Sequence, residues 1–242
     1  GTISNFSGSG TSYSATFTPT ADSTTDGVIS VASSKFSDAA GNSNLDGADA
    51  NNSVTLTVDT LRPTIAVSSD VASLKAGETA TLSFSLSEAS TNFVANDLSV
   101  SGGTISNFSG SGTSYSATFT PDANSTTDGV ISVASSSFSD NSGNFNTDGS
   151  DANNSVTLTV DTLRPSIAIS SDLASLKAGD TASLTFSLSE VVSDFEEADV
   201  TVTGGTLSNW KSISNSAGSD FMPASSSSYS ATKEVRVVHL NH

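Results

Sequence analysis

The sequence repeats itself with one fixed offset, and this repeat limits what the chain can fold into. The segment GTISNFSGSGTSYSATFTP occupies residues 1–19 and returns unchanged at residues 103–121. VTLTVDTLRP at residues 54–63 returns at residues 156–165, which is also 102 residues later. Similarity at one fixed period is the signature of a tandem array of structural units.

The same offset divides the 242 residues into three parts. They are the second part of one repeat, one complete repeat and the start of a third: 1–59, 60–161 and 162–242. From residue 211 the third copy departs from the pattern, and its ending KEVRVVHLNH matches nothing upstream. A complete repeat has the length of an ordinary small domain, about 100 residues, so we expect each copy to be one domain.

Charge and composition exclude several classes of protein. The chain has 25 Asp and Glu against 8 Lys and Arg, a net charge of −17, so we expect no nucleic-acid partner because phosphate groups would repel it. It has no Cys and only two His, which excludes disulfide scaffolds and thiolate metal sites and leaves little material for imidazole catalysis. No run of about 18 apolar residues is present, so we expect no insertion into a membrane.

Apolar residues in the complete repeat alternate with Ser and Thr, as Ala80, Leu82, Phe84 and Leu86 do. A period of two is typical of an antiparallel sheet with one face on a core and the other in water. Alternation and Gly-containing turns predict seven strands, at 64–69, 79–87, 96–100, 103–108, 113–120, 129–135 and 154–160. Seven short strands without a helical segment predict an all-β chain of tandem immunoglobulin-like β-sandwich domains. Aromatic residues that recur with the repeat are expected in the core, with Trp210 in the core or at a strand edge: Phe6, Phe17, Phe36, Phe84 and Phe119.

Several linked motifs resemble one family. They are a DTxxP linker, a SLKAGETAT strand, SEAS or SEVV followed by Phe, the segment DLSVSGGTISNFSGSG, and then YSATFTP and FSDAAGN. This combination is similar to the bacterial Ig-like repeats that form the extender regions of giant secreted surface adhesins, including RTX-type, biofilm and ice-binding adhesins. The resemblance covers residues 1–210. It implies an extracellular module on the bacterial cell surface whose linkers are stiffened by structural calcium.

An acidic loop that occurs twice is the first candidate metal site. Its first copy has side-chain oxygens at positions 1, 3 and 5 and Gly at position 6, the spacing of a calcium loop, and the second copy repeats this. Both early positions are Asn, and position 12 carries no Glu. An Asx-rich loop whose side chains cap its own backbone is the alternative, and the sequence leaves both open. The candidate ligands are Asn42, Asn44, Asp46 and Asp49, and Asn144, Asn146, Asp148 and Asp151.

The linker between domains is the second candidate site. In an Ig-like sandwich the linker Asp should meet acids from the domain behind it and the domain ahead of it. At the first junction these are Asp59, with Asp22 and Asp26 behind and Glu88, Asp97, Asp148 and Asp151 ahead. At the second they are Asp161, with Asp70, Asp122 and Asp128 behind and Glu190, Asp194, Glu196, Glu197 and Asp199 ahead. So many carboxylates predict a Ca²⁺ ion among them, whereas a solvated acidic surface with Arg62 or Arg164 as counter-ion is the alternative.

Pro63 and Pro165 follow the linker acids by four residues and favour an extended, restricted connection. The sequence therefore predicts a non-enzymatic structural extender, a calcium-stiffened rod whose partners are the neighbouring repeats of the same chain. A ligand-binding adhesive module for a sugar or a surface is one alternative. Head-to-tail self-association is another, because residues 1–59 lack the first strands of a domain and residues 162–210 supply roughly those strands.

Overall fold

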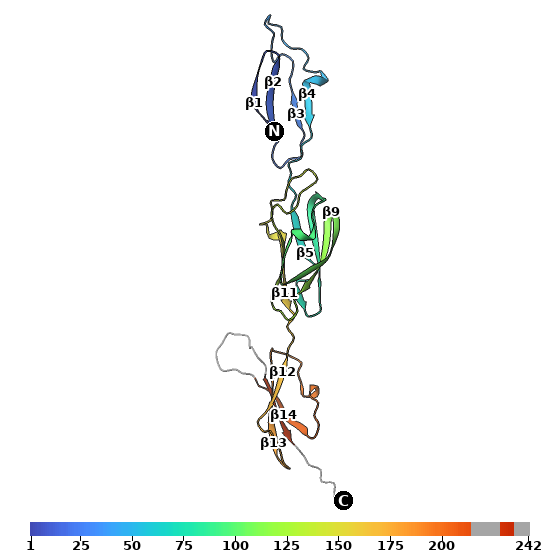
Figure 1. Ribbon diagram of the computed structural model, residues 1–242, viewed down its shortest axis with the longest axis vertical. Coiled ribbons are helices and arrows are strands. Elements are labelled where there is room, and N and C mark those ends of the chain that lie inside the picture. Colours follow the sequence, from blue (N-terminus) through green and yellow to red (C-terminus); the bar gives the residue numbers. More distant parts are fainter. Residues whose placement is uncertain (214–227, 235–242) are drawn as a thin grey trace. The chain divides into compact units, whose positions relative to one another are not determined.

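The computed structural model describes residues 1–213 and 228–234, which form two units, residues 1–163 and the part after Leu163 (Figure 1). The predicted all-β class is confirmed, because the helices in these residues are single 3-10 turns: Ala50–Asn52, Ala95–Asp97, Ala152–Asn154 and Glu197–Asp199. None of the described residues belongs to a helix long and apolar enough to cross a membrane.

The complete repeat is a sandwich of two sheets. Its strands are β5 (Ile65–Ser69), β6 (Ser73–Lys75), β7 (Ala80–Ser90), β8 (Leu98–Ser101), β9 (Gly103–Pro121), β10 (Gly129–Val133) and β11 (Ser155–Asp161). One sheet has the order β5-β7-β9 and the other the order β6-β11-β10-β8. All pairs are antiparallel except β6 with β11, which is parallel. This is the Ig-like sandwich that the alternation predicts.

One apolar core lies between these sheets. On β7 the alternating residues Leu82 and Phe84 point inward and are fully buried, while the Ser and Thr between them are exposed. Phe93 lies at the centre of an aromatic cluster, with ring centroids 5.1 Å from Tyr115 and 5.3 Å from Phe138. The core positions predicted for Phe84 and Phe119 are confirmed, since both side chains are fully buried.

Two features of the complete repeat differ from the sequence prediction. The strands expected at 103–108 and 113–120 are one continuous strand, β9, in which Gly110 and Gly112 take positive φ values of 138° and 64°. The segment Ser73–Lys75, expected to be loop, is strand β6, which pairs with the distant β11. Pairing between remote segments leaves no periodic pattern in three residues, so alternation could not reveal it.

The first, partial copy contains two hairpins: β1 (Thr2–Ser9) with β2 (Ser12–Thr18), and β3 (Gly27–Ser30) with β4 (Ser53–Leu56). Their registers match those of the complete repeat, as Gly27 pairs with Leu56 and Gly129 with Leu158. The core positions predicted for Phe6 and Phe36 are wrong, because both side chains are exposed. Phe17 is half-buried. Residues 1–58 contain no counterparts of β5 to β8, so these rings have no opposing sheet.

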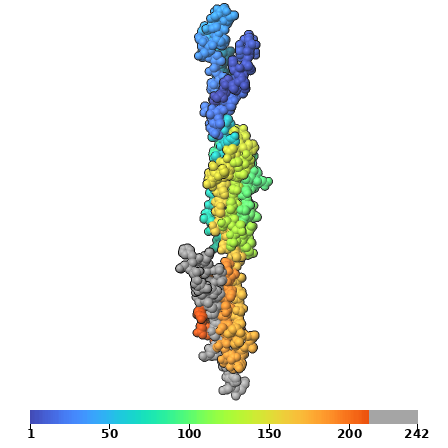
Figure 2. All heavy atoms as spheres, turned by 90° about the vertical axis from the view of Figure 1, so that its left-hand side faces the viewer, coloured from blue at the N-terminus to red at the C-terminus, as the bar shows by residue number. Residues whose placement is uncertain are grey.

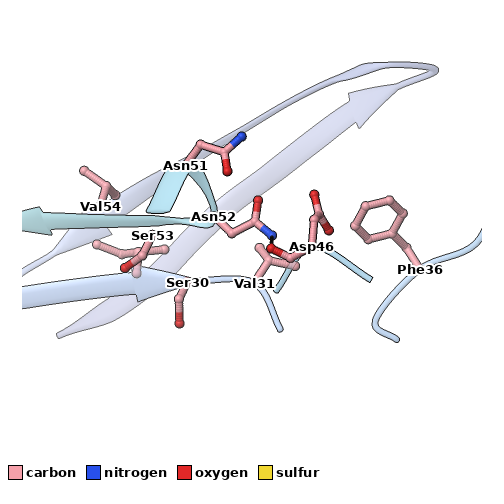
Figure 3. A pocket seen from close by; sticks show the side chains of 9 residues that line it. Ser30, Val31, Phe36, Asp46, Asn51, Asn52, Ser53 and Val54 are labelled. Atoms are coloured by element: carbon pink, nitrogen blue, oxygen red, sulfur yellow. Dashed lines mark hydrogen bonds between the residues drawn. The ribbon is translucent and has the colours of Figure 1, made fainter. Parts of the chain in front are cut away.

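Two clefts open on this uncovered face. In Figure 2 a gap separates the dark-blue β1–β2 hairpin from the lighter-blue loop that follows β3. Phe6, Tyr13, Val31 and Phe36 are among the residues lining a cleft of about 800 Å³ there. In a second cleft, Val31 and Phe36 lie near Asp46, whose backbone carbonyl accepts a hydrogen bond from the Asn52 amide (Figure 3).

The second unit holds one sheet, in the order β12-β13-β15-β14. Its strands are β12 (Ile167–Ser171), β13 (Thr181–Leu188), β14 (Thr206–Ile213) and β15 (Ser228–Glu234). The Trp210 ring packs with Phe186 and Phe195 at centroid distances of 5.3 Å, which agrees with its predicted place beside the core. Most of the divergent ending predicted from residue 211, including both His, lies outside the described residues.

Candidate metal centre

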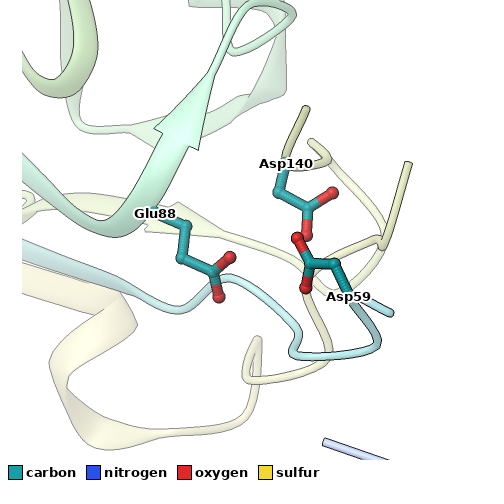
Figure 4. Close-up of side chains that lie close together, drawn as sticks. All are labelled: Asp59, Glu88 and Asp140. Carbon is teal, nitrogen blue, oxygen red and sulfur yellow. The ribbon is translucent and has the colours of Figure 1, made fainter. Parts of the chain in front are cut away.

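Three carboxylates from separate parts of unit 1 meet at the start of the complete repeat. Asp59 lies in the linker before β5, Glu88 near the end of β7, and Asp140 in the loop between β10 and β11 (Figure 4). Each side chain offers an oxygen within 4.8 Å of the oxygens of the other two. Among the described residues this is the one acidic group with a geometry suited to a metal ion.

Asp140 is fixed by the loop that carries it. Its Oδ1 accepts hydrogen bonds from the backbone N–H groups of Ser142 (2.8 Å) and Asn144 (2.9 Å), and its Oδ2 accepts one from the Asn144 side-chain amide at 2.8 Å. Gly143 makes the turn possible with φ of 90°. The loop therefore holds the carboxylate as an Asx turn, in one orientation.

The linker is held on the same loop. Ser142 Oγ donates to Asp59 Oδ2 at 2.7 Å, and the Asn144 amide donates to the Asp59 backbone carbonyl at 3.1 Å. Arg62 Nη1 donates to the Phe145 carbonyl at 3.4 Å. The Pro63 side chain is fully buried. These contacts position Asp59 without neutralising it, since each donor is uncharged except Arg62, which binds a backbone carbonyl.

Two carboxylate oxygens in the group are buried without a hydrogen-bond partner, Asp59 Oδ1 and Glu88 Oε1. The ion pair found in the described part of the chain joins Lys75 to Glu78, so none of the three acids is paired with a base. Burial, followed by the charges of Asp59 and Asp140, raises the pKa of Glu88. Buried, unpaired negative charge destabilises a fold unless a cation compensates it.

The pKa of Asp140 moves in the other direction. Burial alone would raise this pKa, but the hydrogen bonds from the Asn144 side chain and from the backbone of Asn144, Ser142 and Gly143 outweigh burial and lower it. Asp140 is therefore kept ionised beside Asp59 and Glu88, each of which has one oxygen without a hydrogen-bond partner. A cation bound here would be attracted by a carboxylate that is already charged and ordered.

The donor set fits a hard cation. Carboxylate oxygens without His or Cys favour Ca²⁺ or Mg²⁺ over Zn²⁺ and other soft metals. Ca²⁺ binds oxygen at about 2.3–2.6 Å, so two of its ligands lie up to about 5 Å apart, which the separations of up to 4.8 Å match. Ca²⁺ also takes about six to eight oxygen ligands, so backbone oxygens or water would complete the shell.

Comparison with protein families identifies the family of this chain. A family model described as bacterial Ig-like domain matches residues 1–58, 59–160 and 161–239. The chain belongs to the bacterial Ig-like domain family. The matched segments adjoin at residues 58 and 59 and at residues 160 and 161.

Among solved structures, one similar chain is FdeC, an adhesin of Escherichia coli, with 21% sequence identity and a TM-score of 0.38; the match covers 88% of this chain and 67% of that chain. No curated protein sequence gave a significant match.

In the complete Ig-like domain, most of the predicted loop ligands form hydrogen bonds with the loop and the backbone beside it. Asn146 is fully buried; its Oδ1 accepts from the backbone N–H of Ser137 and Phe138, and its Nδ2 donates to the Ala134 carbonyl. Asp148 accepts from that same amide and from the Ile65 backbone N–H at 2.7 Å. Of the predicted loop ligands in this copy, Asn144 contacts the three-carboxylate centre: its side-chain amide donates to the Asp59 backbone carbonyl and to Asp140 Oδ2.

The other predicted ligands lie apart from the three-carboxylate centre. Asp26 and Asp128 accept from the backbone N–H of Val58 and Val160, and Asp161 accepts from that of Leu163. Asp49 and Asp151 precede single-turn helices without a side-chain capping bond. In the first copy Asn42 donates to Asp38, and Asn44 bonds the backbone of Ala32, Lys35 and Phe36 and the side chain of Asp46.

Asp140 is the member of the centre that sequence reasoning missed, while Asp59 and Glu88 were both expected at this junction. The calcium-loop spacing was counted from Asn144, four residues after Asp140, and so did not include Asp140. The sequence does contain a signal for Asp140: the motif FSD occurs at residues 36–38 and 138–140, directly before each copy of the Asx-rich loop. Only the fold shows that this acid faces Glu88.

Proposed function

We propose that this chain is a non-enzymatic structural segment of a bacterial surface adhesin, in which successive Ig-like domains hold another part of the protein away from the cell. Its membership of the bacterial Ig-like domain family and the near identity of its repeats support this, because identical copies add length rather than a new binding surface. An acid that recurs with the repeat serves the fold more readily than it serves a single active site.

The second part of the proposal is a Ca²⁺ ion bound by Asp59, Glu88 and Asp140. The observation that carries it is the pair of buried oxygens without partners, Asp59 Oδ1 and Glu88 Oε1, directed into a group of three acids with no base. An ion there would join the linker to β7 and to the loop between β10 and β11. It would therefore restrict the linker at the point where the domain begins.

The linker residue after Asp59 supports this mechanical role. Thr60 Oγ1 donates to the Thr20 carbonyl at 2.6 Å, and its backbone N–H donates to the Ser23 carbonyl at 2.9 Å. Thr162 makes the same bonds to the carbonyls of Asp122 and Ser125 one repeat later. Thr60 thus bonds to the domain behind the linker, and Asp59 bonds to the domain ahead of it. The cation would therefore act on a connection that is already short and held by hydrogen bonds.

Calcium titration of thermal unfolding tests this function. A ligand that binds only the folded state at about 100 times its Kd raises the free energy of unfolding by about 2.7 kcal/mol. We expect calcium to raise the Tm of the complete domain, and Glu88→Gln to remove that increase. In EDTA at neutral pH the Glu88→Gln protein should be at least as stable as the parent, because the substitution removes a buried charge that lacks a partner.

Asp151→Asn is the matched control. Asp151 lies in the same loop as Asp140 and makes no capping bond, so its substitution should leave the calcium response intact. A Tm that ignores calcium in the parent would exclude the proposed ion. A response lost in Asp151→Asn but kept in Glu88→Gln would move the ion from the three-carboxylate centre to the Asx-rich loop.

A further inference from the structure

Glu88 lies in a stretch of β7 that the sheet does not hold in regular register. Pairing of β7 with β9 is regular as far as Ser85, opposite Ser114, and resumes only at Ser90, opposite Gly112. A step of five residues on β7 therefore matches a step of two on β9, which is an irregularity of the β-bulge type. A bulge bends its strand and changes the direction of its side chains. The strand ladder alone thus does not fix the direction of the Glu88 carboxylate.

A side-chain contact just beyond this bulge joins two of the elements that carry the acids. Asn92 follows Glu88 by four residues and lies between β7 and the turn Ala95–Asp97. Its Oδ1 accepts a hydrogen bond from the Ser139 backbone N–H at 3.0 Å, and its Nδ2 donates to Ser139 Oγ at 3.1 Å. Ser139 directly precedes Asp140. The two bonds therefore connect the segment after Glu88 to the loop that presents Asp140.

The Asn92 side chain is exposed, but buried groups hold it in place. Ser90 Oγ donates to Asn92 Oδ1 at 2.8 Å, and Ser90 itself is buried. The Ser90 carbonyl in turn accepts a hydrogen bond from the buried Tyr115 hydroxyl at 2.8 Å. The next residue, Phe93, packs its ring against that of Phe138. Because these groups form one connected network with the core, Asn92 cannot move without disturbing buried contacts.

We propose that Asn92 is a positioning residue of the metal centre, which holds the Glu88 carboxylate at a distance from Asp140 that one cation can bridge. Asn92 is not a ligand in this proposal, because its side-chain oxygen already accepts hydrogen bonds from Ser90 and Ser139. Residues that orient metal ligands without touching the metal commonly change its affinity by about 10–100-fold. The proposal rests on the proposed function and adds the residue on which the geometry of the site depends.

The chain itself supplies a conservative variant of this residue. The repeat position of Asn92 is occupied by Asp194 in the third copy. A carboxylate at residue 92 keeps an acceptor for the Ser139 N–H and for Ser90 Oγ. It loses the amide donor, but the Ser139 hydroxyl can turn and donate to the carboxylate instead. Asn92→Asp should therefore keep the connection between the two elements, whereas Asn92→Ala removes it.

Calorimetric titration of the full chain with calcium tests the proposal, at a temperature at which circular dichroism shows every variant to be folded. We expect Asn92→Ala to weaken binding about tenfold, and Asn92→Asp to keep at least the parental affinity. Thr118→Val is the matched control, because it removes the hydrogen bond from the Asn107 amide in the same domain. Thr118 lies opposite Thr81, seven residues or about 20 Å from Glu88 along β7, so calcium binding should be unchanged.

Europium(III) luminescence provides a readout that a purely structural role of Asn92 would not change. This hard cation takes oxygen ligands, and its lifetimes in H₂O and D₂O report the water bound to it. We expect additional bound water in Asn92→Ala alone, since solvent replaces a carboxylate that has turned away. If Asn92→Ala lowers only the Tm in EDTA, or if Asn92→Asp weakens binding equally, the positioning role fails and the ion stands. If the parent binds no calcium, or Glu88→Gln leaves binding unchanged, the proposed function fails and this inference with it.

Discussion

Glu88 is the residue on which the pH behaviour of the centre depends. Its pKa is raised above the ordinary 4.5 by burial and then by the charges of Asp59 and Asp140. The folded state therefore binds this proton more tightly than the unfolded state does. The resulting stability is fully present below about pH 4.5 and is lost as pH rises through the folded pKa. Asp140 has the opposite effect, and at lower pH. Its pKa is lowered, so the stability that it contributes is present above its ordinary pKa of 3.8 and is lost as pH falls below that value.

In EDTA, we expect the complete domain to lose stability as pH rises from about 4.5 toward neutrality, and Glu88→Gln to remove this part of the pH dependence. Calcium should reverse the trend, since the ion requires the ionised carboxylate. Urea unfolding at a series of pH values, with EDTA or with calcium, measures both effects. Equal pH dependence of the parent and Glu88→Gln in EDTA would show that Glu88 does not titrate abnormally.

The loop between β10 and β11 is the element that joins the fold to the metal centre. Asn146 anchors it at its inner end through four hydrogen bonds, and Asp140 presents the carboxylate at its outer end. The same Asn occurs as Asn44 in the first copy, with the same four bonds but a half-buried side chain. The loop conformation is therefore set locally, while the cost of losing it depends on what covers it.

Replacing Asn146 by Ala should destabilise the complete domain by about 2–4 kcal/mol, because the fully buried amide is lost and the backbone groups of residues 134, 137 and 138, of which Phe138 is buried, lose their partner. Asn44→Ala, the matched control, should cost less than about 1 kcal/mol, since water replaces the amide there. Hydrogen exchange of the two loops, resolved by peptide, compares the substitutions in one chain. Comparable losses at both positions would mean that burial does not set the cost.

The sequence predicted those strands whose alternation of apolar and polar residues lies within the strand itself. Alternation on β7 and β11 gave strands within a few residues of their observed ends, because each strand has one face on the core. Segment 73–75 was missed because it is a strand through its pairing with β11; the identical Ser175–Lys177, beside which the described residues place no such strand, is not a strand. Asp140 was missed for the same reason, since its relation to Glu88 exists only after both sheets have formed.

At the scale of the whole molecule, the continuous apolar core of the described residues lies in the complete repeat. All sixteen residues of the continuous core cluster lie between Ile65 and Val160, in the complete repeat. Residues 1–58 have the same apolar side chains, yet of these only Val58 is buried. Two hairpins without a shared core are marginal in water, since isolated hairpins have little stability of their own.

Proteolysis at high dilution should therefore leave a resistant fragment that begins near residue 59 and ends near residue 163, because its backbone opens only with the whole core. Residues 27–56 should be cut quickly under these conditions, since hairpins with exposed apolar faces open at little cost. Mass spectrometry of the fragments provides the measurement. Protection of residues 27–56 as strong as that of residues 65–160 would contradict this prediction, because burial in the core would then not set the rate of cleavage.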